Sequence, residues 1–429
     1  MPAAPMHYRP PNISRWLVWG MFALALALAP RLFDSGASLS MMSLMGTVMI
    51  FALSYNMLLG QGGMLSFGHA VYSGLGAFMS IHAINLASAG ELVLPLPLIP
   101  LVGGVAGLLF GALFGYVTTK RAGTTFSMIS LGVVELVFAC SLMFPGFFGG
   151  EAGISGDRVY GTPFFGLSFG PQIQVYYLIA VWLFISTAAM FAFAHTPLGR
   201  IVNAVRDNPE RAEFIGYDTR RVRWLVLMLS GFFAGISGGL SAINFELVSA
   251  ENVSLARSGA VLLFTFIGGT GVFFGPLLGA IVGIFMTVML SEFTKAWQLY
   301  LGLFFVLMVM YAPGGLASLI MANLRIAQFA KLARVLPAGL AIMLSSLVAA
   351  AGAIVLIEML YHWSLESAQG SELQLFGVTV DTAASGGWVT GSVLLAAGGL
   401  SFMLTRAPFV RVWDQVNTEI EQQLARSHS

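Results

Sequence analysis

The stretch "QVYYLIAVWLFISTAAMFAFAHTPLGRIVNAVRDNPERAEFIGYDTRRVRWLVLMLSGFFAGISGGLSAINFEL", residues 174–247, decides the fold. Two long apolar runs flank a polar centre, residues 195–226, which holds six arginines, two aspartates and two glutamates. A helix crosses a bilayer with roughly 20 apolar residues, and each run is long enough. The pattern predicts two membrane spans joined by a charged connection on one side of the membrane.

The composition extends this prediction to the whole chain. Of 429 residues, 57% are hydrophobic and 9% are charged, whereas a soluble domain has about 25% charged residues. Backbone groups in hydrocarbon must be hydrogen-bonded within their own segment, so long apolar runs favour helices over barrel strands. We expect an all-α polytopic membrane protein. The net charge of +1 says nothing about nucleic-acid or acidic partners. We expect no nucleic-acid partner, and membrane lipid is the expected surrounding.

The apolar runs predict about ten spans in a domain at residues 1–324 and two more in an extension at 325–429. The expected helices are 16–33, 38–60, 64–86, 97–119, 124–144, 174–194, 224–247, 258–271, 275–292, 297–319, 337–361 and 387–405. The C-terminal tail places Val412, Val416, Ile420 and Leu424 four residues apart, which predicts an amphipathic helix. That helix would lie on the membrane, contact a soluble partner, or pack on the chain itself.

Lysine and arginine indicate the orientation, because they are retained on the cytoplasmic side. With a cytoplasmic N-terminus, sixteen of the 20 basic residues lie inside, and four lie outside: Arg31, Arg158, Arg257 and Lys295. We therefore expect both termini to be cytoplasmic. The first span also has features of a cleavable signal peptide. Pro30 directly after Ala29 disfavours cleavage, so we expect this span to be retained; cleavage would move only the N-terminus outside.

The polar centre contains "DNPERAEFIG", residues 207–216, which has the start and stop signals of a short helix. Asp207 or Asn208 can cap it, and Glu210 can complete a capping box. Gly216 is a suitable C-terminal stop. The helix would carry a small apolar patch of Ala212, Phe214 and Ile215 among charges. Such an element suits docking to a soluble partner; the alternative is a basic loop that only sets topology.

Five stretches resemble the permease subunits of branched-chain amino acid ABC importers of the LivM type. In chain order they are "SYNMLLGQGGMLSFGHAVYSGLGAF" (54–78), "TTFSMISLGVVELV" (124–137), "TPLGRIVNAVRDNPERAEFIGYDTRRVRWLVLMLSGFFAGISGGL" (196–240), "LFTFIGGTGVFFGPLLGA" (263–280) and "YLGLFFVLMVMYAPGGL" (300–316). The resemblance covers roughly residues 38–320 and does not reach the extension. It implies a multi-pass protein of the bacterial inner membrane that imports a solute.

The resemblance also implies partners and roles. The importer would comprise this permease, a second permease, two ATPase subunits that bind ATP and Mg²⁺, and a periplasmic substrate-binding protein. The cytoplasmic helix at 207–216 would insert into a groove of an ATPase subunit. The residues expected to take part in this coupling are Arg206, Asp207, Asn208, Arg211, Ala212, Glu213, Phe214 and Gly216. Which solute is carried would depend largely on the binding protein.

No ATP site is expected in this chain itself. A P-loop has the pattern G-x-x-x-x-G-K-[ST]. The three lysines are Lys120, Lys295 and Lys331, and none stands in that pattern. The sparse His, Asp and Glu residues form no set with metal-ligand or catalytic-triad spacing, and the single cysteine, Cys140, excludes an internal disulfide. We expect a chain that is not an enzyme and holds no cofactor or metal.

Polar residues inside apolar runs are candidates for the translocation pathway, because such groups are costly in the membrane. These candidates are Asn56, Gln61, Ser66, His69 and Glu135. The first four lie in a glycine-rich stretch that disfavours a continuous helix. The stretch would be a broken helix whose free N–H groups receive a carboxylate, or a tight turn between packed spans. Glu135 would have a partner on another helix or face the pathway.

The main alternative is a secondary transporter or channel driven by an ion gradient. It fits the composition equally well, but it predicts more acidic residues within the spans than Glu135 alone supplies. It also leaves the capped cytoplasmic helix unexplained. A membrane-embedded enzyme is the second alternative, and no catalytic set supports it.

Overall fold

The computed structural model describes residues 13–160, 166–329, 331–366, 371–375 and 378–427. Its first helices are α1 (Ile13–Leu32), α2 (Gly36–Asn56), η1 (Met57–Gln61), α3 (His69–Ser88), η2 (Leu96–Leu98), α4 (Ile99–Thr118), α5 (Thr124–Met143) and α6 (Pro145–Phe148). After β1 (Ile154–Ser155) come α7 (Gln172–His195), α8 (Pro197–Asp207), α9 (Pro209–Phe214), α10 (Thr219–Phe245), β2 (Leu247–Val248) and η3 (Ala250–Val253).

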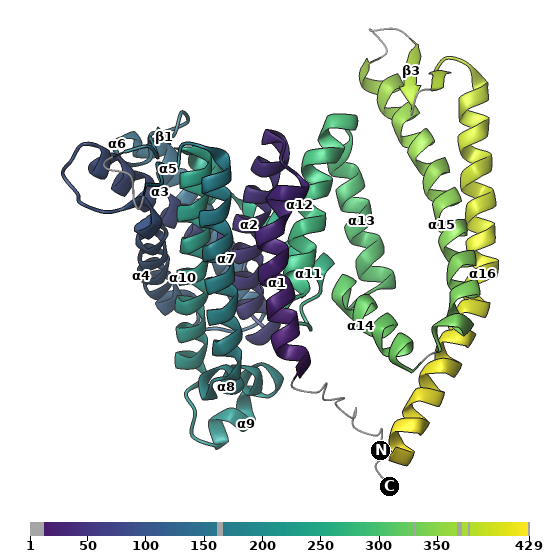
Figure 1. Cartoon of the computed structure of the whole chain (residues 1–429), viewed down its shortest axis with the longest axis horizontal. Coiled ribbons are helices and arrows are strands. Elements are labelled where there is room, and N and C mark those ends of the chain that lie inside the picture. The colour runs from purple at the N-terminus through teal and green to yellow at the C-terminus, as the bar shows by residue number, and fades with distance from the viewer. Residues whose placement is uncertain (1–12, 161–165, 330, 367–370, 376–377, 428–429) are drawn as a thin grey trace. The chain divides into compact units, whose positions relative to one another are not determined.

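The remaining elements are α11 (Leu255–Gly268), α12 (Gly275–Phe293), α13 (Trp297–Tyr311), α14 (Gly315–Gln328), α15 (Leu332–Tyr361), η4 (His362–Glu366), β3 (Glu372–Leu375), β4 (Val378–Asp381) and α16 (Ser385–Ser427) (Figure 1). Among the described residues, nine helices are long and apolar enough to cross a membrane, or ten if the bent pair α13–α14 counts as one span. The expected all-α polytopic fold is confirmed.

Each of the twelve expected ranges contains a helix, but three differ from a plain span. The apolar helices at Trp16–Leu32 and Leu255–Gly268 are shorter than 18 residues. The expected continuous helix at 297–319 is wrong, because the chain bends by 48° between α13 and α14. Pro313 and two glycines occupy the bend, and Gly315 has a φ of 72°, which a residue with a side chain rarely adopts.

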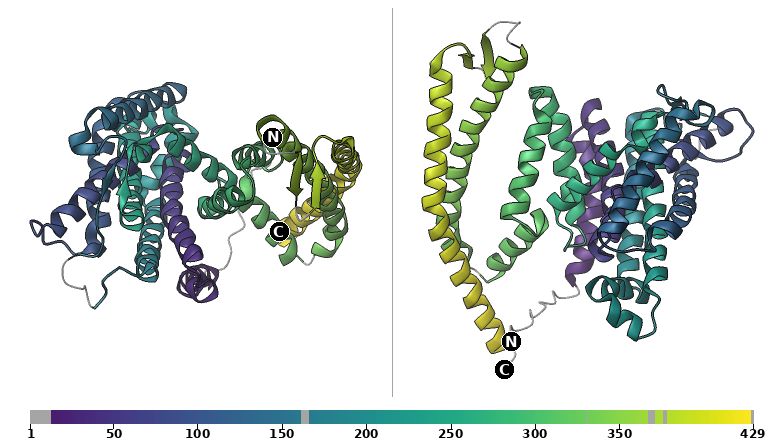
Figure 2. Two further views of the ribbon diagram at one scale, coloured as in Figure 1. Left: turned by 90° about the horizontal axis from the view of Figure 1, so that it is seen from above. Right: turned by 180° about the vertical axis from the view of Figure 1, so that it is seen from behind.

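The chain divides into two compact units. Unit 1 comprises Met1–Val288 and Phe305–Ala317, and unit 2 comprises Met289–Phe304 and Ser318–Ser429. The separation into a permease domain and an extension, expected at residue 324, stays a prediction. Unit 1 contains every residue proposed for coupling and all five residues proposed for the pathway. Figure 2 gives two further views of the ribbon.

Close contact between α3, α4 and α10 forms the centre of unit 1 (Figure 1). Glycines face one another where these helices meet: a Cβ atom on Gly235 would lie 2.1 Å from the carbonyl oxygen of Gly103. A Cβ atom on Gly238 would lie 1.9 Å from that of Ser73. Membrane helices associate largely through packing, since lipid is as apolar as leucine, so small residues allow the backbones to approach.

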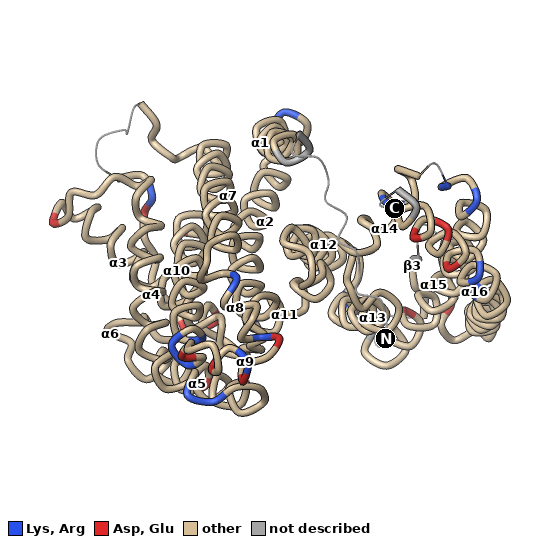
Figure 3. Tube along the Cα trace, turned by 90° about the horizontal axis from the view of Figure 1, so that it is seen from below, with Lys and Arg blue, Asp and Glu red and all other residues tan. Residues whose placement is uncertain are grey.

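The two ends of unit 1 differ in character. The charged connection, α8 and α9, lies at one end of the bundle, and α6 and β1 lie at the other (Figure 1). Seen from below, Lys, Arg, Asp and Glu gather around α8 and α9, while the helices above are almost free of colour (Figure 3). The polar centre of the sequence is therefore a folded cap on the bundle.

Unit 2 carries the C-terminal extension. Its long helices α15 and α16 pack together and are joined through the antiparallel pair β3–β4. Helix α16 has 43 residues, about 65 Å, which exceeds the roughly 30 Å of a hydrocarbon core. Its apolar stripe contacts the chain itself: Val416 and Ile420 are buried with Ile326 and Val335. Glu419 pairs with Lys331 at 2.8 Å and Arg334 at 3.1 Å.

We predict that Gly235→Ala destabilises the bundle, because the new methyl group must displace the backbone of α4. Overpacking of this kind typically costs about 1–3 kcal/mol. Gly132→Ala is the matched control, since no atom lies within 4 Å of its Cβ position. Thermal unfolding in detergent measures the difference. Equal midpoints for the two variants would contradict the packing described here.

Candidate functional site

Two consecutive short helices form the charged end of unit 1. Helix α8 is capped by Thr196, whose side chain accepts a hydrogen bond from the backbone N–H of Gly199 at 3.2 Å. It contacts α7, α9, α10 and η1. The sequence predicted only the second helix, α9; the signal for α8 was the "TPLG" start, with threonine as cap and proline in the first turn.

Both ends of α9 are fixed by hydrogen bonds. Asn208, rather than Asp207, is the N-cap: its Oδ1 accepts from the N–H of Arg211 at 2.9 Å. At the other end the backbone N–H of Gly216 donates to the carbonyl oxygen of Glu213, and that of Tyr217 donates to the carbonyl oxygen of Ala212. This pair of hydrogen bonds is the pattern of a Schellman motif. Gly216 has a φ of 98°, so this end depends on glycine.

The side chains of α9 separate into a packed face and an exposed face. Ala212, expected on the docking patch, is only 3% exposed and lies against the chain itself. Phe214 is 90% exposed and the following Ile215 is 69% exposed. Arg211 is also exposed. The sequence did not single out Tyr217, which adds a third large exposed side chain at 44%.

Helix α9 is tied to the helix that follows it. The Glu213 carboxylate accepts a hydrogen bond from the Thr219 hydroxyl at 2.7 Å. Asp218 caps α10 by accepting from the backbone N–H of Arg221 at 3.1 Å. The expected coupling residues Glu213 and Gly216 therefore act first within the chain: they hold α9 at a set angle to α10.

Arg206 and Asp207 lie at the junction of α8 and α9. The Arg206 guanidinium pairs with the Asp207 carboxylate at 2.9 Å and donates from Nη1 to the carbonyl oxygen of Gly60. Its side chain also passes directly over Gly63, where a Cβ atom would lie 2.6 Å from Arg206 Cγ. Gly63 has a φ of 64°. Arg206 thus joins α8 to the glycine-rich stretch whose polar residues the sequence analysis proposed for the pathway.

That stretch is not a continuous helix: it is a non-helical break between two separate candidate spans, Gly36–Gln61 and His69–Ser88. Helix α2 ends in the π-helical turn η1, residues 62–68 are not helical, and α3 begins at His69. Serines of neighbouring helices bond the irregular backbone: Ser127 donates to the carbonyl oxygen of Leu65, and Ser130 accepts from the N–H of Phe67 at 2.9 Å. These serines lie in apolar runs, and sequence reasoning did not single them out as functional residues.

Four predicted pathway residues come together at this break. His69 is fully buried, and its Nε2 lies 3.0 Å from the Ser54 hydroxyl. Ser66 is fully buried beside it, and its carbonyl oxygen accepts from the Tyr55 hydroxyl at 3.0 Å. Asn56 Oδ1, Gln61 Oε1 and His69 Nδ1 are buried and have no hydrogen-bond partner among the described residues. Unsatisfied buried polar atoms are unusual and call for an explanation.

Glu135 lies away from this group. It is exposed on α5, whose opposite face buries Phe126, Ser127, Ser130, Val134, Val137 and Ser141. No ion pair to Glu135 occurs within the part of the chain that the structure describes. An isolated carboxylate midway along a span is too costly to face lipid. The exposed face of α5 is therefore the surface of unit 1 where protein or water is expected.

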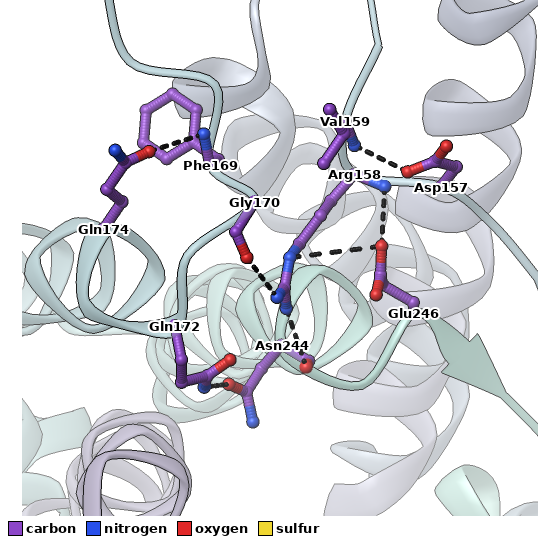
Figure 4. Close-up of polar contacts among 9 residues, drawn as sticks. All are labelled: Asp157, Arg158, Val159, Phe169, Gly170, Gln172, Gln174, Asn244 and Glu246. Carbon is purple, nitrogen blue, oxygen red and sulfur yellow. Dashed lines mark hydrogen bonds and ion pairs between the residues drawn. The ribbon is translucent and has the colours of Figure 1, made fainter. Parts of the chain in front are cut away.

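At the opposite end of unit 1, Arg158 fastens the loop before α7 to the end of α10 (Figure 4). Its guanidinium donates to the carbonyl oxygens of Gly170 at 2.9 Å and Asn244 at 3.3 Å. Its backbone N–H donates to Glu246 Oε1 at 2.9 Å. Glu246 has a φ of 54°, unusual for a non-glycine residue, and the contacts to Arg158 hold it there. The strands β1 and β2 pair alongside.

These features describe a polytopic helical membrane protein with a folded, charged segment at one end of unit 1. A family model for the branched-chain amino acid transport system / permease component matches residues 38–313. The chain belongs to this family of ABC transporter permeases. The match ends before the C-terminal extension.

The relatives include proteins with different cargoes. The chain is 26% identical over 324 residues to the high-affinity branched-chain amino acid transport system permease LivM of Escherichia coli K12, covering 71% of this chain and 75% of that protein. It is 26% identical to the fructose import permease FrcC of Rhizobium meliloti, over 49% and 62% of the two chains. The guanosine ABC transporter permease NupQ of Bacillus subtilis is also 26% identical, over 40% and 56%. No solved structure gives a significant match.

We predict that Arg206→Ala loosens the break between α2 and α3, because it removes a charged donor to the carbonyl oxygen of Gly60 and the side chain that covers Gly63. A hydrogen bond of this kind at a partly exposed site contributes about 1 kcal/mol. Hydrogen exchange of residues 57–68 should become several-fold faster. Arg200→Ala, an exposed arginine on the same helix, is the control and should leave this exchange unchanged. Identical exchange in both variants would show that Arg206 does not hold the break.

Glu246→Ala should release the loop that Arg158 fastens, whereas Glu246→Gln should not, because the amide oxygen still accepts the Arg158 N–H. Arg158 has a side chain only 12% exposed, so trypsin cuts after it slowly in the folded protein. Limited proteolysis in detergent should show several-fold faster cleavage at Arg158 in the alanine variant. If glutamine and alanine behave alike, the carboxylate oxygen is not what holds the loop.

Proposed function

We propose that this chain is the permease subunit of an ATP-driven importer for branched-chain amino acids or a related small carboxylate or amide solute. Separate ATPase subunits, which bind ATP and Mg²⁺, would act on it through residues 207–216. A periplasmic binding protein would deliver the solute, and a second permease would complete the pathway. The relatives named for branched-chain amino acid transport support the substrate class. The relatives named for fructose import and for guanosine transport are the reason to test this substrate class.

One observation carries the coupling proposal: the tip of α9 presents apolar side chains to solvent on a rigid base. Phe214 is 90% exposed although it is the last residue of a helix that is capped at both ends. A large exposed aromatic residue on a firmly held segment is typical of a contact surface for another protein. The exposed Arg211 beside it could pair with acidic groups of that partner.

The geometry supports a mechanical role for this tip. Helix α9 contacts both α8 and α10, and the Glu213–Thr219 hydrogen bond holds it against α10. A displacement of α9 by a closing ATPase would therefore tilt α10 as a rigid body, one of the common modes of switching. Because α10 packs without side chains between its glycines and α3 and α4, these helices would move with it.

The exposed carboxylate of Glu135 supports the proposal that a second permease packs against α5. In a single chain it would face lipid midway along α5, which is energetically unfavourable. A second permease against this face would enclose Glu135 at the subunit interface or beside a water-filled pathway.

The orientation that places α9 in the cytoplasm also follows the distribution of lysine and arginine. It puts the Arg158 network outside, where a binding protein would dock.

The test is uptake by proteoliposomes that hold this permease with the second permease and ATPases and that receive the binding protein. We expect leucine uptake that requires both ATP and the binding protein. Phe214→Ala should reduce ATPase association, since an exposed aromatic contact of this kind typically contributes about 2 kcal/mol or more. Phe293→Ala, a phenylalanine that is 82% exposed outside this segment, is the matched control.

Two outcomes would reject the proposal. Uptake by the permease alone, driven only by a proton or sodium gradient, would establish the secondary-transporter alternative. Full ATPase association and uptake in the Phe214 variant would show that the α9 tip is not the docking surface. The first outcome bears on the energy source, and the second only on the site of coupling.

A further inference from the structure

Arg257 lies inside the membrane region of unit 1, although its sequence position suggested an outer loop. Its guanidinium carbon is 5.9 Å from the centre of the Phe51 ring, and Phe51 stacks on His69 at 5.4 Å. Phe51 is ten residues before the end of η1 at Gln61, about 15 Å along the helix. The arginine side chain is therefore near the middle of the span formed by α2.

Two helices begin beside this arginine. Helix α3 starts at His69 and α11 starts at Leu255. The backbone N–H of Ala70, in the first turn of α3, donates to the hydroxyl of Ser258, in the first turn of α11, at 2.9 Å. The N-terminal end of a helix carries a partial positive charge. Two such ends and a guanidinium thus meet at one depth of the membrane.

The Arg257 guanidinium has no close ionic partner within the described part of the chain; the Glu251 carboxylate acts on its charge only from a longer distance. Arg257 makes no ion pair within 4.0 Å there, and its Nε is buried without a hydrogen bond. Nδ1 of the fully buried His69 is likewise unsatisfied. An unpaired arginine at membrane depth is costly, and such residues usually face a water-filled pathway and serve the transported solute. The contact with the Phe51 ring offsets only a small part of that cost.

We infer that Arg257 is the point in the pathway where the carboxylate of the transported solute binds. A planar guanidinium offers paired donors that match a carboxylate, and converging helix ends favour the same negative group. His69, whose Nδ1 is free to take part in a hydrogen bond, lies at the same place. This inference rests on the proposed import function and narrows its substrate to solutes that carry a carboxylate. Neutral sugars and nucleosides lack the group that Arg257 binds.

The first experiment changes the charge at Arg257 in the complete transporter, with leucine as the probe. Arg257→Gln should lower ATP-driven leucine uptake about tenfold or more, the loss expected for one charge-assisted hydrogen bond. The ATPase rate should change little, because the variant leaves α8 and α9 intact. Arg257→Lys should keep part of the uptake. Arg31→Gln, an exposed arginine at the end of α1, is the matched control and should transport normally.

The second experiment separates a charge requirement from a structural role. Cys140 is the only cysteine, so a Cys140→Ser chain with Arg257→Cys has one thiol, at the site in question. Aminoethyl methanethiosulfonate adds an ammonium group there, and methyl methanethiosulfonate adds an uncharged group of smaller size. We expect the first reagent to restore leucine uptake and the second to leave it low. Reaction with the charged reagent also requires that water reaches the site.

The outcomes distinguish this inference from the proposed function. Leucine uptake by Arg257→Gln at the wild-type rate, or equal rescue by both reagents, would overturn the role of the charge. A wild-type transporter that uses ATP to carry fructose but not leucine would overturn the carboxylate inference and leave the importer intact. Uptake that needs no ATP would overturn the importer, while the variants would still decide whether Arg257 binds leucine.

Discussion

A peptide group that leaves helical geometry within a membrane must find its hydrogen-bond partner elsewhere in the protein. The break between α2 and α3 meets this constraint with hydroxyl groups from two other helices. Ser127 and Ser130 of α5 bond the non-helical segment, and Ser258 of α11 bonds the first turn of α3. The positions of α5 and α11 therefore depend on the break, and the polar residues proposed for the pathway are brought together because those helices are held against it.

Helix α10 connects the two ends of unit 1. It runs without interruption from Thr219 to Phe245. Thr219 is hydrogen-bonded to Glu213 of α9, and Phe245 is next to the Arg158–Glu246 network. Between these points its glycines bring it into backbone contact with α3 and α4. A helix that is held at both ends, and whose glycines lie in direct backbone contact with its neighbours, transmits tilt rather than absorbing it. This makes the loop that Arg158 fastens and the α8–α9 segment parts of one rigid assembly.

Composition and hydropathy were sufficient to predict the helical fold, because a span is a local property of about 20 residues. The helix at 207–216 was predictable for the same reason, since Asn208 and Gly216 act on neighbours three or four residues away. Contacts between distant segments were not predictable. Nothing in the sequence near Arg206 indicates Gly60, and Arg257 was counted with the outer loops because its neighbours in sequence are polar. Ala212 was expected to be exposed because a six-residue helix has too few positions to define its buried face.

The bond from Arg206 to Gly60 gives the coupling segment a second connection to the membrane interior, independent of α7 and α10. Thermodynamic reciprocity then applies in both directions. If nucleotide-driven movement of α8 changes the conformation of the break, occupancy of the break by solute must change the affinity of the same complex for nucleotide by the same factor. Solute bound in the permease would in this way change the nucleotide affinity of the ATPase subunits. ATP hydrolysis without transported solute would then be limited by the membrane-spanning subunit.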